Sequence, residues 1–184
     1  MADLDDPVKK ISSRVIYQNR WMTIREDKTR LPSGNEGIYG YLESKDSVMI
    51  IVFDEQYRIY LVKGFRYPSK NWGWLLPGGN SDGEDLLAAS KRELEEETGI
   101  LADHWEIAGK TLVCDGFMTE RMATCIAHDI HFDGTKENSD EKFAGMQFFT
   151  LEEIDDMIDK GEIDDGQTIT GLYFAKRWLA RKEK

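Results

Sequence analysis

The sequence predicts an α/β protein in which a small antiparallel β unit precedes the main domain. Three observations favour this fold class. β-branched and aromatic residues recur in partial alternation before residue 66, as is typical of strands. Apolar residues then recur at helical spacing across 83–98, and later strand-like segments are followed by helical patterns near the carboxyl end. We therefore divide the chain into a β unit at residues 1–45 and a main domain at 46–184.

The β unit and the start of the main domain contain the first predicted strands. Strands are expected at 14–17, 21–31 and 37–42, with a turn at 32–35 where Pro, Ser, Gly and Asn follow one another. In the main domain, two apolar segments at 48–53 and 58–65 flank a short polar stretch. We interpret this pair as a hairpin near the centre of a sheet, followed by a loop.

The central helix is expected between residues 83 and 98. Leu86, Leu87, Ala89 or Ser90, and Leu94 form an apolar stripe, and Gly99 stands where a helix stops. Further strands are expected at 105–114, 122–131 and 146–149, and the two cysteines in this region are interpreted as buried reduced thiols. Thr150 and Glu153 form a capping box for a short helix, and 168–182 has the pattern of a closing helix.

Composition limits the classes of partner. The formal net charge of −11 opposes nonspecific attraction to nucleic acid or to anionic membranes, so we expect neither partner. The first ten residues do not have the basic start and apolar core of a signal peptide, and the apolar run at 48–53 is too short to span a bilayer. We therefore expect a cytoplasmic protein whose phosphorylated ligands meet local positive charge.

Three carboxylates carry the clearest chemical signal. Glu93, Glu96 and Glu97 stand at i, i+3 and i+4, so a helix places them on one side, where they repel one another. A solvated acidic helix face is the ordinary explanation of such a run. The crowding becomes favourable when divalent cations lie among the oxygens, because hard ions such as Mg²⁺ prefer oxygen ligands.

The residues around this cluster resemble a known motif. Gly78, Glu84, Arg92, Glu93, Leu94, Glu96, Glu97, Gly99 and Ile100 reproduce every fixed position of the Nudix box, G-x5-E-x7-R-E-U-x-E-E-x-G-U, where U is bulky and aliphatic. The seven invariant positions coincide by chance on the order of once in 10⁷ starting positions. The resemblance implies a Nudix α/β/α sandwich, in which a loop-helix-loop lies against a mixed sheet.

The resemblance also implies roles for the box residues. It makes Glu93 and Glu97 the leading ligands of Mg²⁺, with Mn²⁺ as an alternative, and gives both a catalytic part. Glu96 becomes a third ligand, and the Gly78 carbonyl a backbone ligand. The structural residues of the box are then Glu84 and Arg92, expected to brace the loop by a salt bridge, and Gly99, expected to end the helix.

Outside the box, the chain resembles the ADP-ribose and nucleoside diphosphate sugar branch of the family. Residues 61–67, LVKGFRY, are similar to the "LVxQYR" strand end of that branch, and Arg66 is the candidate phosphate-binding side chain. The "PGFxxE" segment is matched at Gly116 and Glu120, which makes Glu120 a substrate contact, although Asp115 replaces the proline. Leu75 likewise replaces the glutamate of "WELPxG".

The remaining predicted contacts are a general base and a base-stacking pair. In similar enzymes a carboxylate on a loop after the box deprotonates the attacking water. Glu141 occupies the matching region, with Glu137 as the substitute. Tyr17 and Trp21 are candidates for stacking on a purine, across a dimer interface as in similar proteins. We therefore expect a homodimer formed through the β unit.

The expected activity is metal-dependent hydrolysis of the diphosphate bond of a nucleoside diphosphate sugar, such as ADP-ribose or GDP-mannose. The products are a nucleoside monophosphate and a sugar phosphate. Two alternatives stay open. One is a Nudix hydrolase of nucleoside triphosphates or dinucleoside polyphosphates; the other is a non-catalytic nucleotide-sugar sensor.

Overall fold

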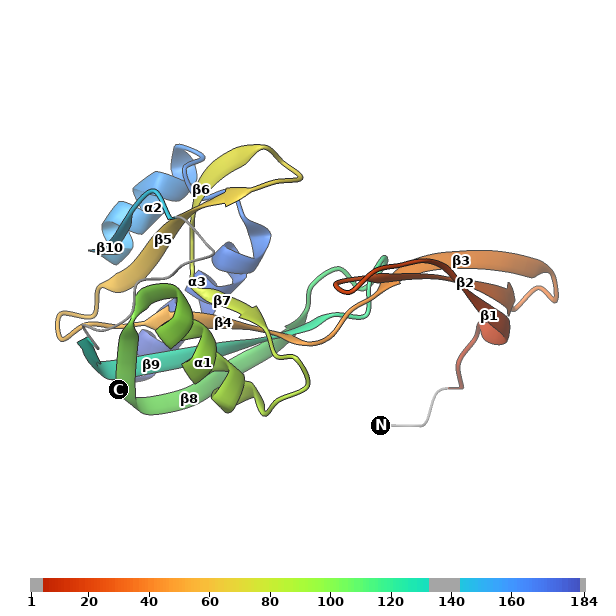
Figure 1. Ribbon diagram of the computed structural model, residues 1–184, viewed down its shortest axis with the longest axis horizontal. Coiled ribbons are helices and arrows are strands. Elements are labelled where there is room, and N and C mark those ends of the chain that lie inside the picture. The colour runs from red at the N-terminus through yellow and green to blue at the C-terminus, as the bar shows by residue number, and fades with distance from the viewer. Residues whose placement is uncertain (1–4, 133–142, 183–184) are drawn as a thin grey trace. The chain divides into compact units, whose positions relative to one another are not determined.

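The computed structural model describes residues 5–132 and 143–182, which divide into two compact units. The first unit comprises residues 1–45 and 112–120, and the second comprises 46–111 and 121–184. Figure 1 labels their helices and strands.

The first unit is built on one antiparallel sheet with the strand order β1-β2-β3. Its strands are β1 (Lys9–Gln18), β2 (Thr23–Arg30) and β3 (Glu36–Glu43). The turn between β1 and β2 is organised by Asn19, whose side-chain oxygen accepts hydrogen bonds from the backbone N–H groups of Trp21 and Met22, both at 2.9 Å. The segment 112–120 joins this sheet through a parallel bridge between Leu42 and Met118.

The second unit contains two sheets and three helices. A four-stranded sheet has the order β7-β4-β9-β8, and a three-stranded sheet has the order β10-β5-β6. β4 runs parallel to β9 and antiparallel to β7, so the larger sheet is mixed. The strands are β4 (Ser47–Val52), β5 (Ile59–Arg66), β6 (Asn71–Leu75), β7 (Gly78–Asn80), β8 (Ile100–Leu112), β9 (Arg121–Phe132) and β10 (Met146–Phe149). The helices are α1 (Leu86–Thr98), α2 (Leu151–Asp159) and α3 (Gly166–Lys182).

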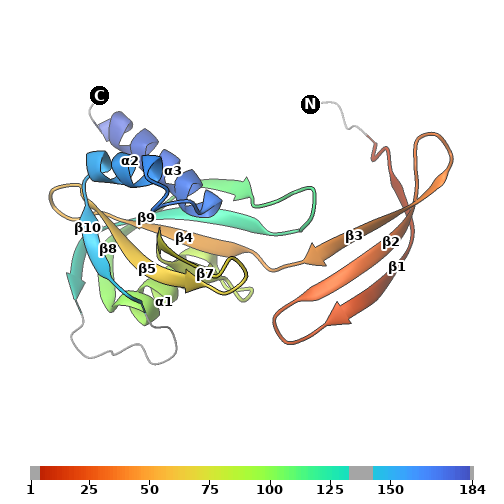
Figure 2. The ribbon, with the colours of Figure 1, turned by 90° about the horizontal axis from the view of Figure 1, so that it is seen from above.

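The core explains why helices cover both sides of the larger sheet. All six residues of β4 are buried, and side chains of a strand alternate between its two faces. Val48 packs with the buried Ala89 of α1, and Ile50 packs with Leu94 of the same helix. Phe53, one residue past the strand, stacks on Trp178 of α3 with ring centroids 5.0 Å apart. Figure 2 shows α1 and α3 on opposite sides of this sheet, so the predicted α/β fold with a mixed sheet and preceding antiparallel strands is confirmed.

Two expectations about the sheets are wrong. The segments 48–53 and 58–65 do not form a hairpin within one sheet, because β4 pairs with β7 and β9 whereas β5 pairs with β6 and β10. A single bridge between Phe53 and Ile59 joins them before the strands diverge. The segment expected as a loop after residue 65 contains β6, which pairs with β5 from Val62 to Arg66.

The two cysteines differ from each other. Cys125 is buried, as predicted, but Cys114 is exposed. The prediction failed for Cys114 because the strand β8 ends at Leu112, and Cys114 lies in the following segment of the first unit.

Candidate active site

The acidic helix α1 begins and ends at well-defined caps. The Asp85 side chain accepts hydrogen bonds from the backbone N–H groups of Leu87, at 3.0 Å, and Ala88, at 3.2 Å, which satisfies donors that the helix itself leaves unpaired. At the other end, Gly99 has φ 68° and ψ 11°, in the left-handed region that glycine adopts without strain. The two caps set the limits of the helix, so Glu93, Glu96 and Glu97 fall in its last turns.

Two glycines bring the backbone of β7 against the carboxylates of α1. The Gly78 N–H donates a hydrogen bond to Glu97 Oε2 at 3.0 Å. A Cβ atom on Gly79 would stand 2.6 Å from the Glu93 carboxyl carbon, which is inside van der Waals contact. Gly78 has φ 154°, and a Cβ there would overlap the carbonyl oxygen of Val48 in the neighbouring strand. Glycine is therefore needed at both positions for the helix carboxylates to lie against this strand.

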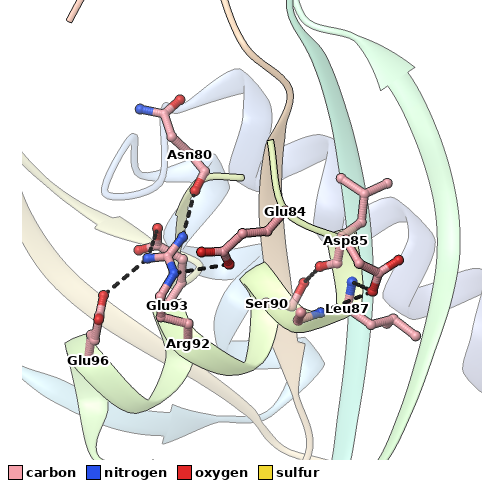
Figure 3. Close-up of polar contacts among 10 residues, drawn as sticks. Asn80, Glu84, Asp85, Leu87, Ser90, Arg92, Glu93 and Glu96 are labelled. Carbon is pink, nitrogen blue, oxygen red and sulfur yellow. Dashed lines mark hydrogen bonds and ion pairs between the residues drawn. The ribbon is translucent and has the colours of Figure 1, made fainter. Parts of the chain in front are cut away.

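Arg92 ties the loop to the helix (Figure 3). Its Nη1 donates to Glu93 Oε1 at 2.8 Å and to Glu96 Oε2 at 3.1 Å. Its Nε lies 3.3 Å from Glu84 Oε2, and its Nη2 donates to the Asn80 carbonyl oxygen at 3.0 Å. Partial burial alone would lower the pKa of the Arg92 guanidinium. The hydrogen bond and negative charge of Glu93, with the hydrogen bonds of Glu84 and Glu96, outweigh this effect and raise the pKa above its ordinary value, so the group is a permanent cation.

The electrostatic balance of the box follows from this arrangement. One guanidinium meets three carboxylates, those of Glu84, Glu93 and Glu96, while Glu97 is stabilised by a backbone N–H. Glu93 and Glu97 are half-buried and Glu96 is exposed. Sequence reasoning anticipated the pair of Glu84 and Arg92 but missed the contacts of Arg92 with Glu93 and Glu96. The i,i+4 spacing of Arg92 and Glu96 was the available signal.

The donor set fits a hard divalent cation. Glu93, Glu96 and Glu97 offer carboxylate oxygens and Gly78 offers a backbone carbonyl, the ligand types that Mg²⁺ and Mn²⁺ prefer. A carboxylate has about four lone-pair sites, so its bonds to Arg92 or Gly78 are compatible with coordination. In the described part of the chain, the ligand atoms of these glutamates do not already form a group within 4.8 Å. Their side chains would turn toward a shared ion.

Arg66 lies at the end of β5, opposite Asn71 of β6. It lines a cavity of about 230 Å³ between the β5–β6 turn and the start of α3. The Asn71 side-chain amide donates to Asp164 Oδ2 at 3.3 Å in the same cavity. Leu75 also lines it, and the chain runs from Leu75 directly to Gly78 of the box. A guanidinium and carboxylates in one cavity suit a ligand that has both phosphate oxygens and hydroxyl groups.

The other predicted contacts are distributed as follows. Tyr17, Trp21 and Glu120 belong to the first unit, where Tyr17 and Trp21 are exposed. Glu141 and Glu137 lie outside the described residues. The structure thus brings together the box residues of α1 and its preceding loop, while the role of the first-unit residues stays a prediction. Asp164 and Asn71 were missed because they stand 93 positions apart in the chain.

The fold and the box together define an α/β domain in which one helix presents a cluster of carboxylates beside a glycine-containing strand. Comparison with known families shows the NUDIX domain over residues 43–172 and the nucleoside diphosphate sugar hydrolase N-terminal domain over residues 8–42. The chain therefore belongs to the Nudix family, and it is a pyrophosphohydrolase of that family.

Individual relatives support this assignment. The ADP-ribose pyrophosphatase of Mycobacterium tuberculosis is 27% identical over 175 residues, covering 94% of this chain and 84% of the relative. A hydrolase of a CMP-linked phosphonate from Streptomyces rubellomurinus is 37% identical over 87 residues, but the match spans only 47% of this chain and 42% of that protein. The crystal structure of an ADP compounds hydrolase has the same fold, with a TM-score of 0.86, 17% identity and 96% of each chain covered.

Proposed function

We propose that this protein hydrolyses the diphosphate bond of a nucleoside diphosphate sugar, with Mg²⁺ as the cofactor and Mn²⁺ as a substitute. One observation carries the proposal: a complete Nudix box is preceded by a segment that matches the N-terminal domain of nucleoside diphosphate sugar hydrolases. The similarity to an ADP-ribose pyrophosphatase over 94% of the chain supports ADP-ribose as the first substrate to test.

The residues of the chain perform binding and orientation. The Gly78 N–H holds the Glu97 carboxylate in one orientation, and Arg92 holds Glu93. A divalent cation held by these residues would neutralise charge on the nonbridging phosphate oxygens and make the attacking water more acidic. Arg66 has a planar fork that binds two phosphate oxygens at once. In the same cavity, the Asp164 carboxylate accepts a hydrogen bond from a sugar hydroxyl, and the Asn71 amide donates one.

The reaction itself is addition of water to one phosphorus. The P–O–P bond breaks on the far side of that phosphorus, so the products are a nucleoside monophosphate and a sugar phosphate, with no covalent intermediate on the protein. We assign the general base to Glu141, or to Glu137 as its substitute, and base stacking to Tyr17 and Trp21. Glu120 is assigned to the substrate as well.

The substrate panel tests this proposal directly. Purified protein is incubated with Mg²⁺ and, separately, ADP-ribose, GDP-mannose, ADP-glucose and dGTP, and the products are identified by chromatography and mass spectrometry. We expect a nucleotide sugar to give a nucleoside monophosphate and a sugar phosphate. Preferential release of pyrophosphate from dGTP would show instead that the protein is a triphosphate hydrolase.

A matched pair of variants tests the box on the same helix. In Glu97→Gln the amide oxygen still accepts the Gly78 hydrogen bond, but the negative charge is lost. We expect kcat to fall by roughly 10²-fold or more, because a cation ligand has been removed. The control is Glu95→Gln, which changes a neighbouring glutamate at a variable position of the box and should retain activity. Equal activity of both variants would remove Glu97 from the mechanism.

A homodimer formed by the first unit is also part of the proposal. Each residue of β1 is exposed, and a single sheet layer cannot bury its own apolar side chains. The exposed large apolar residues of this unit are Val8, Ile11, Val15, Ile16, Tyr17, Trp21, Met22, Leu31, Ile38, Tyr39, Leu112 and Phe117. A second copy of the chain would cover them. Light scattering should show twice the chain mass for the native protein and the single chain mass for Ile38→Glu; a native monomer would contradict the proposal.

The location of the protein in the cell is also part of the proposal. In the described residues, the helices are too short or too polar to cross a bilayer. We propose a cytoplasmic location, which agrees with the strongly negative net charge of −11 and a small-molecule substrate.

A further inference from the structure

Two histidines and an aspartate of the second unit converge on one carboxylate oxygen. His104 Nδ1 lies 2.7 Å from Asp129 Oδ2, and His128 Nδ1 lies 3.1 Å from the same oxygen. One ligand atom from each of the three residues falls within 4.8 Å of the other two. In the described part of the chain, this histidine–aspartate cluster (His104, His128 and Asp129) is the one group of metal-binding side chains already gathered in this way.

The backbone explains how the cluster forms. His104 belongs to β8, and His128 and Asp129 belong to β9, its neighbour in the four-stranded sheet. Asp129 has φ 56°, a left-handed conformation that is uncommon for a residue with a side chain and is best tolerated by Asn and Asp. Without this backbone reversal, consecutive side chains of a strand would point to opposite faces. The conformation therefore lets His128 and Asp129 meet the same partner.

The imidazole rings pack against each other and against α3. The rings of His104 and His128 are stacked, with centroids 5.0 Å apart and planes inclined by 7°. The His128 ring also lies 5.7 Å from the Trp178 ring of α3. Trp178 in turn donates a hydrogen bond from its indole N–H to Glu106 and stacks on Phe53. The cluster thus rests on the packed sheet while His104 and Asp129 stay open to solvent, with side chains 64% and 60% exposed.

We propose that the histidine–aspartate cluster binds a late first-row divalent cation such as Zn²⁺, Co²⁺ or Ni²⁺, as a second metal site separate from the Nudix box. Two imidazole nitrogens and one carboxylate oxygen are the donors that these ions prefer, whereas an all-oxygen set suits Mg²⁺. The cation takes the place of the Nδ1 hydrogens, and each ring carries its remaining hydrogen on Nε2.

The distances are close to those that coordination requires. For metal–ligand distances of about 2.0–2.1 Å in a tetrahedron, neighbouring ligand atoms stand about 3.3 Å apart. The two observed N–O separations, 2.7 and 3.1 Å, need to open by only a few tenths of an ångström. The two histidine ligand atoms lie within 4.8 Å of each other, but the rings are nearly parallel, so their in-plane lone pairs lie in separate planes. Rotation of the exposed His104 side chain would let both nitrogens face one ion. Three protein ligands leave the fourth position to a water molecule, as in open zinc sites.

Cobalt titration tests the proposal with two readouts that do not depend on hydrolysis. Co²⁺ bound by nitrogen and oxygen ligands gives visible ligand-field absorption, and a paramagnetic ion next to His128 quenches the fluorescence of the adjacent Trp178. Titrations are run on the full chain carrying Cys114→Ser, so that the exposed thiol does not bind the metal. Zn²⁺ is then added to displace Co²⁺.

The variants separate this site from the box and from histidines in general. His104→Gln and Asp129→Asn change exposed side chains of the cluster, and His131→Gln changes the remaining histidine, which is exposed on the same strand β9. We expect at least about tenfold weaker Co²⁺ binding for each cluster variant, as for loss of a group that holds a metal. With excess Mg²⁺ present to occupy the box, Co²⁺ binding by His131→Gln and Glu97→Gln should match that of the parent.

Three results would overturn the proposal. The first is Co²⁺ binding that is the same in the parent and in both cluster variants. The second is an equal loss in His131→Gln, and the third is a loss in Glu97→Gln, which would place the ion in the box instead. Circular dichroism of the metal-free variants establishes that each is folded, and because His104 is mostly exposed, its replacement is compatible with the fold.

Discussion

Replacing Gly79 with alanine should separate the catalytic role of the box from its structural role. The new Cβ would stand 2.6 Å from the carboxyl carbon and Oε2 of Glu93. Ordinary contact begins near 3.4 Å, so the Glu93 carboxylate must move by about 0.8 Å. That carboxylate is the far end of a flexible side chain, so it can move without unfolding the strand. A shift of about 1 Å in a catalytic group lowers the rate by roughly 10²-fold.

The effect on stability should be small. Gly79 is not in the positive-φ region, so alanine fits its backbone and gains about 0.4–1 kcal/mol by restricting the unfolded chain. The displaced hydrogen bond of Glu93 with Arg92 offsets about 1 kcal/mol. The free energy of unfolding should therefore change by less than about 1 kcal/mol, while kcat falls by roughly 10²-fold.

Gly78→Ala provides the contrast. Its Cβ would overlap a backbone oxygen of Val48, which cannot turn aside, and φ 154° is unsuited to alanine. We expect a loss of about 2 kcal/mol or more in the free energy of unfolding. Gly40→Ala, where the nearest atom is an Arg25 carbonyl oxygen at 3.9 Å, is the control for substitution of a strand glycine.

Two measurements on all three variants test these predictions. Steady-state kinetics on the preferred substrate gives kcat, and urea unfolding gives the free energy of unfolding. Full activity of Gly79→Ala at saturating Mg²⁺ would refute the prediction, since the position of the Glu93 carboxylate would then be irrelevant to catalysis. The prediction for Gly78→Ala fails if that variant is as stable as the parent, because the close approach of β7 to β4 would not require glycine.

Three further predictions follow from the contacts. Arg92→Gln removes the cation shared by three glutamates, so the metal-free protein should lose about 1–2 kcal/mol of stability, part of which Mg²⁺ restores in thermal unfolding; no change would show that the contacts contribute nothing. Burial raises the pKa of the Tyr60 phenol above its ordinary 10.0, so the stability it contributes is complete below pH 10 and is lost as pH rises through the folded pKa. Urea unfolding above pH 10 should therefore show a steeper decline for the native protein than for Tyr60→Phe, and parallel curves would count against it. Burial also raises the pKa of the Cys125 thiol, so a thiol reagent should modify Cys114 rapidly and Cys125 only after denaturation; two fast thiols would disprove this.

Local signals in the sequence were sufficient for the helices and for the box. Leu86, Leu94 and Gly99 fix the register and the end of α1, and the capping box of Thr150 with Glu153 is present at the start of α2. These features depend on residues a few positions apart, so their geometry follows from the helix itself. The α1 cap at Asp85 was missed, although an aspartate before two leucines is a recognisable start signal.

Pairings between distant segments were not accessible in the same way. β4 and β5 are adjacent in the chain and both apolar, and only the parallel pairing of β4 with β9, some 75 residues later, shows that they diverge into two sheets. The histidine–aspartate cluster joins His104 to a partner 25 positions later through a left-handed residue that no periodicity indicates. The cavity that Arg66 lines depends in the same way on a distant segment, the start of α3.

The central claim is that the box carboxylates hold a divalent cation against a diphosphate. Anomalous diffraction tests this claim most directly. Crystals of the native protein and of Glu97→Gln are each soaked with Mn²⁺ and a non-hydrolysable ADP-ribose analogue. The native crystal should show an anomalous peak within about 2.0–2.4 Å of Glu93, Glu97 and the Gly78 carbonyl oxygen, and the variant a weaker peak or none. Strong Mn²⁺ density beside the diphosphate but away from α1 would contradict the account.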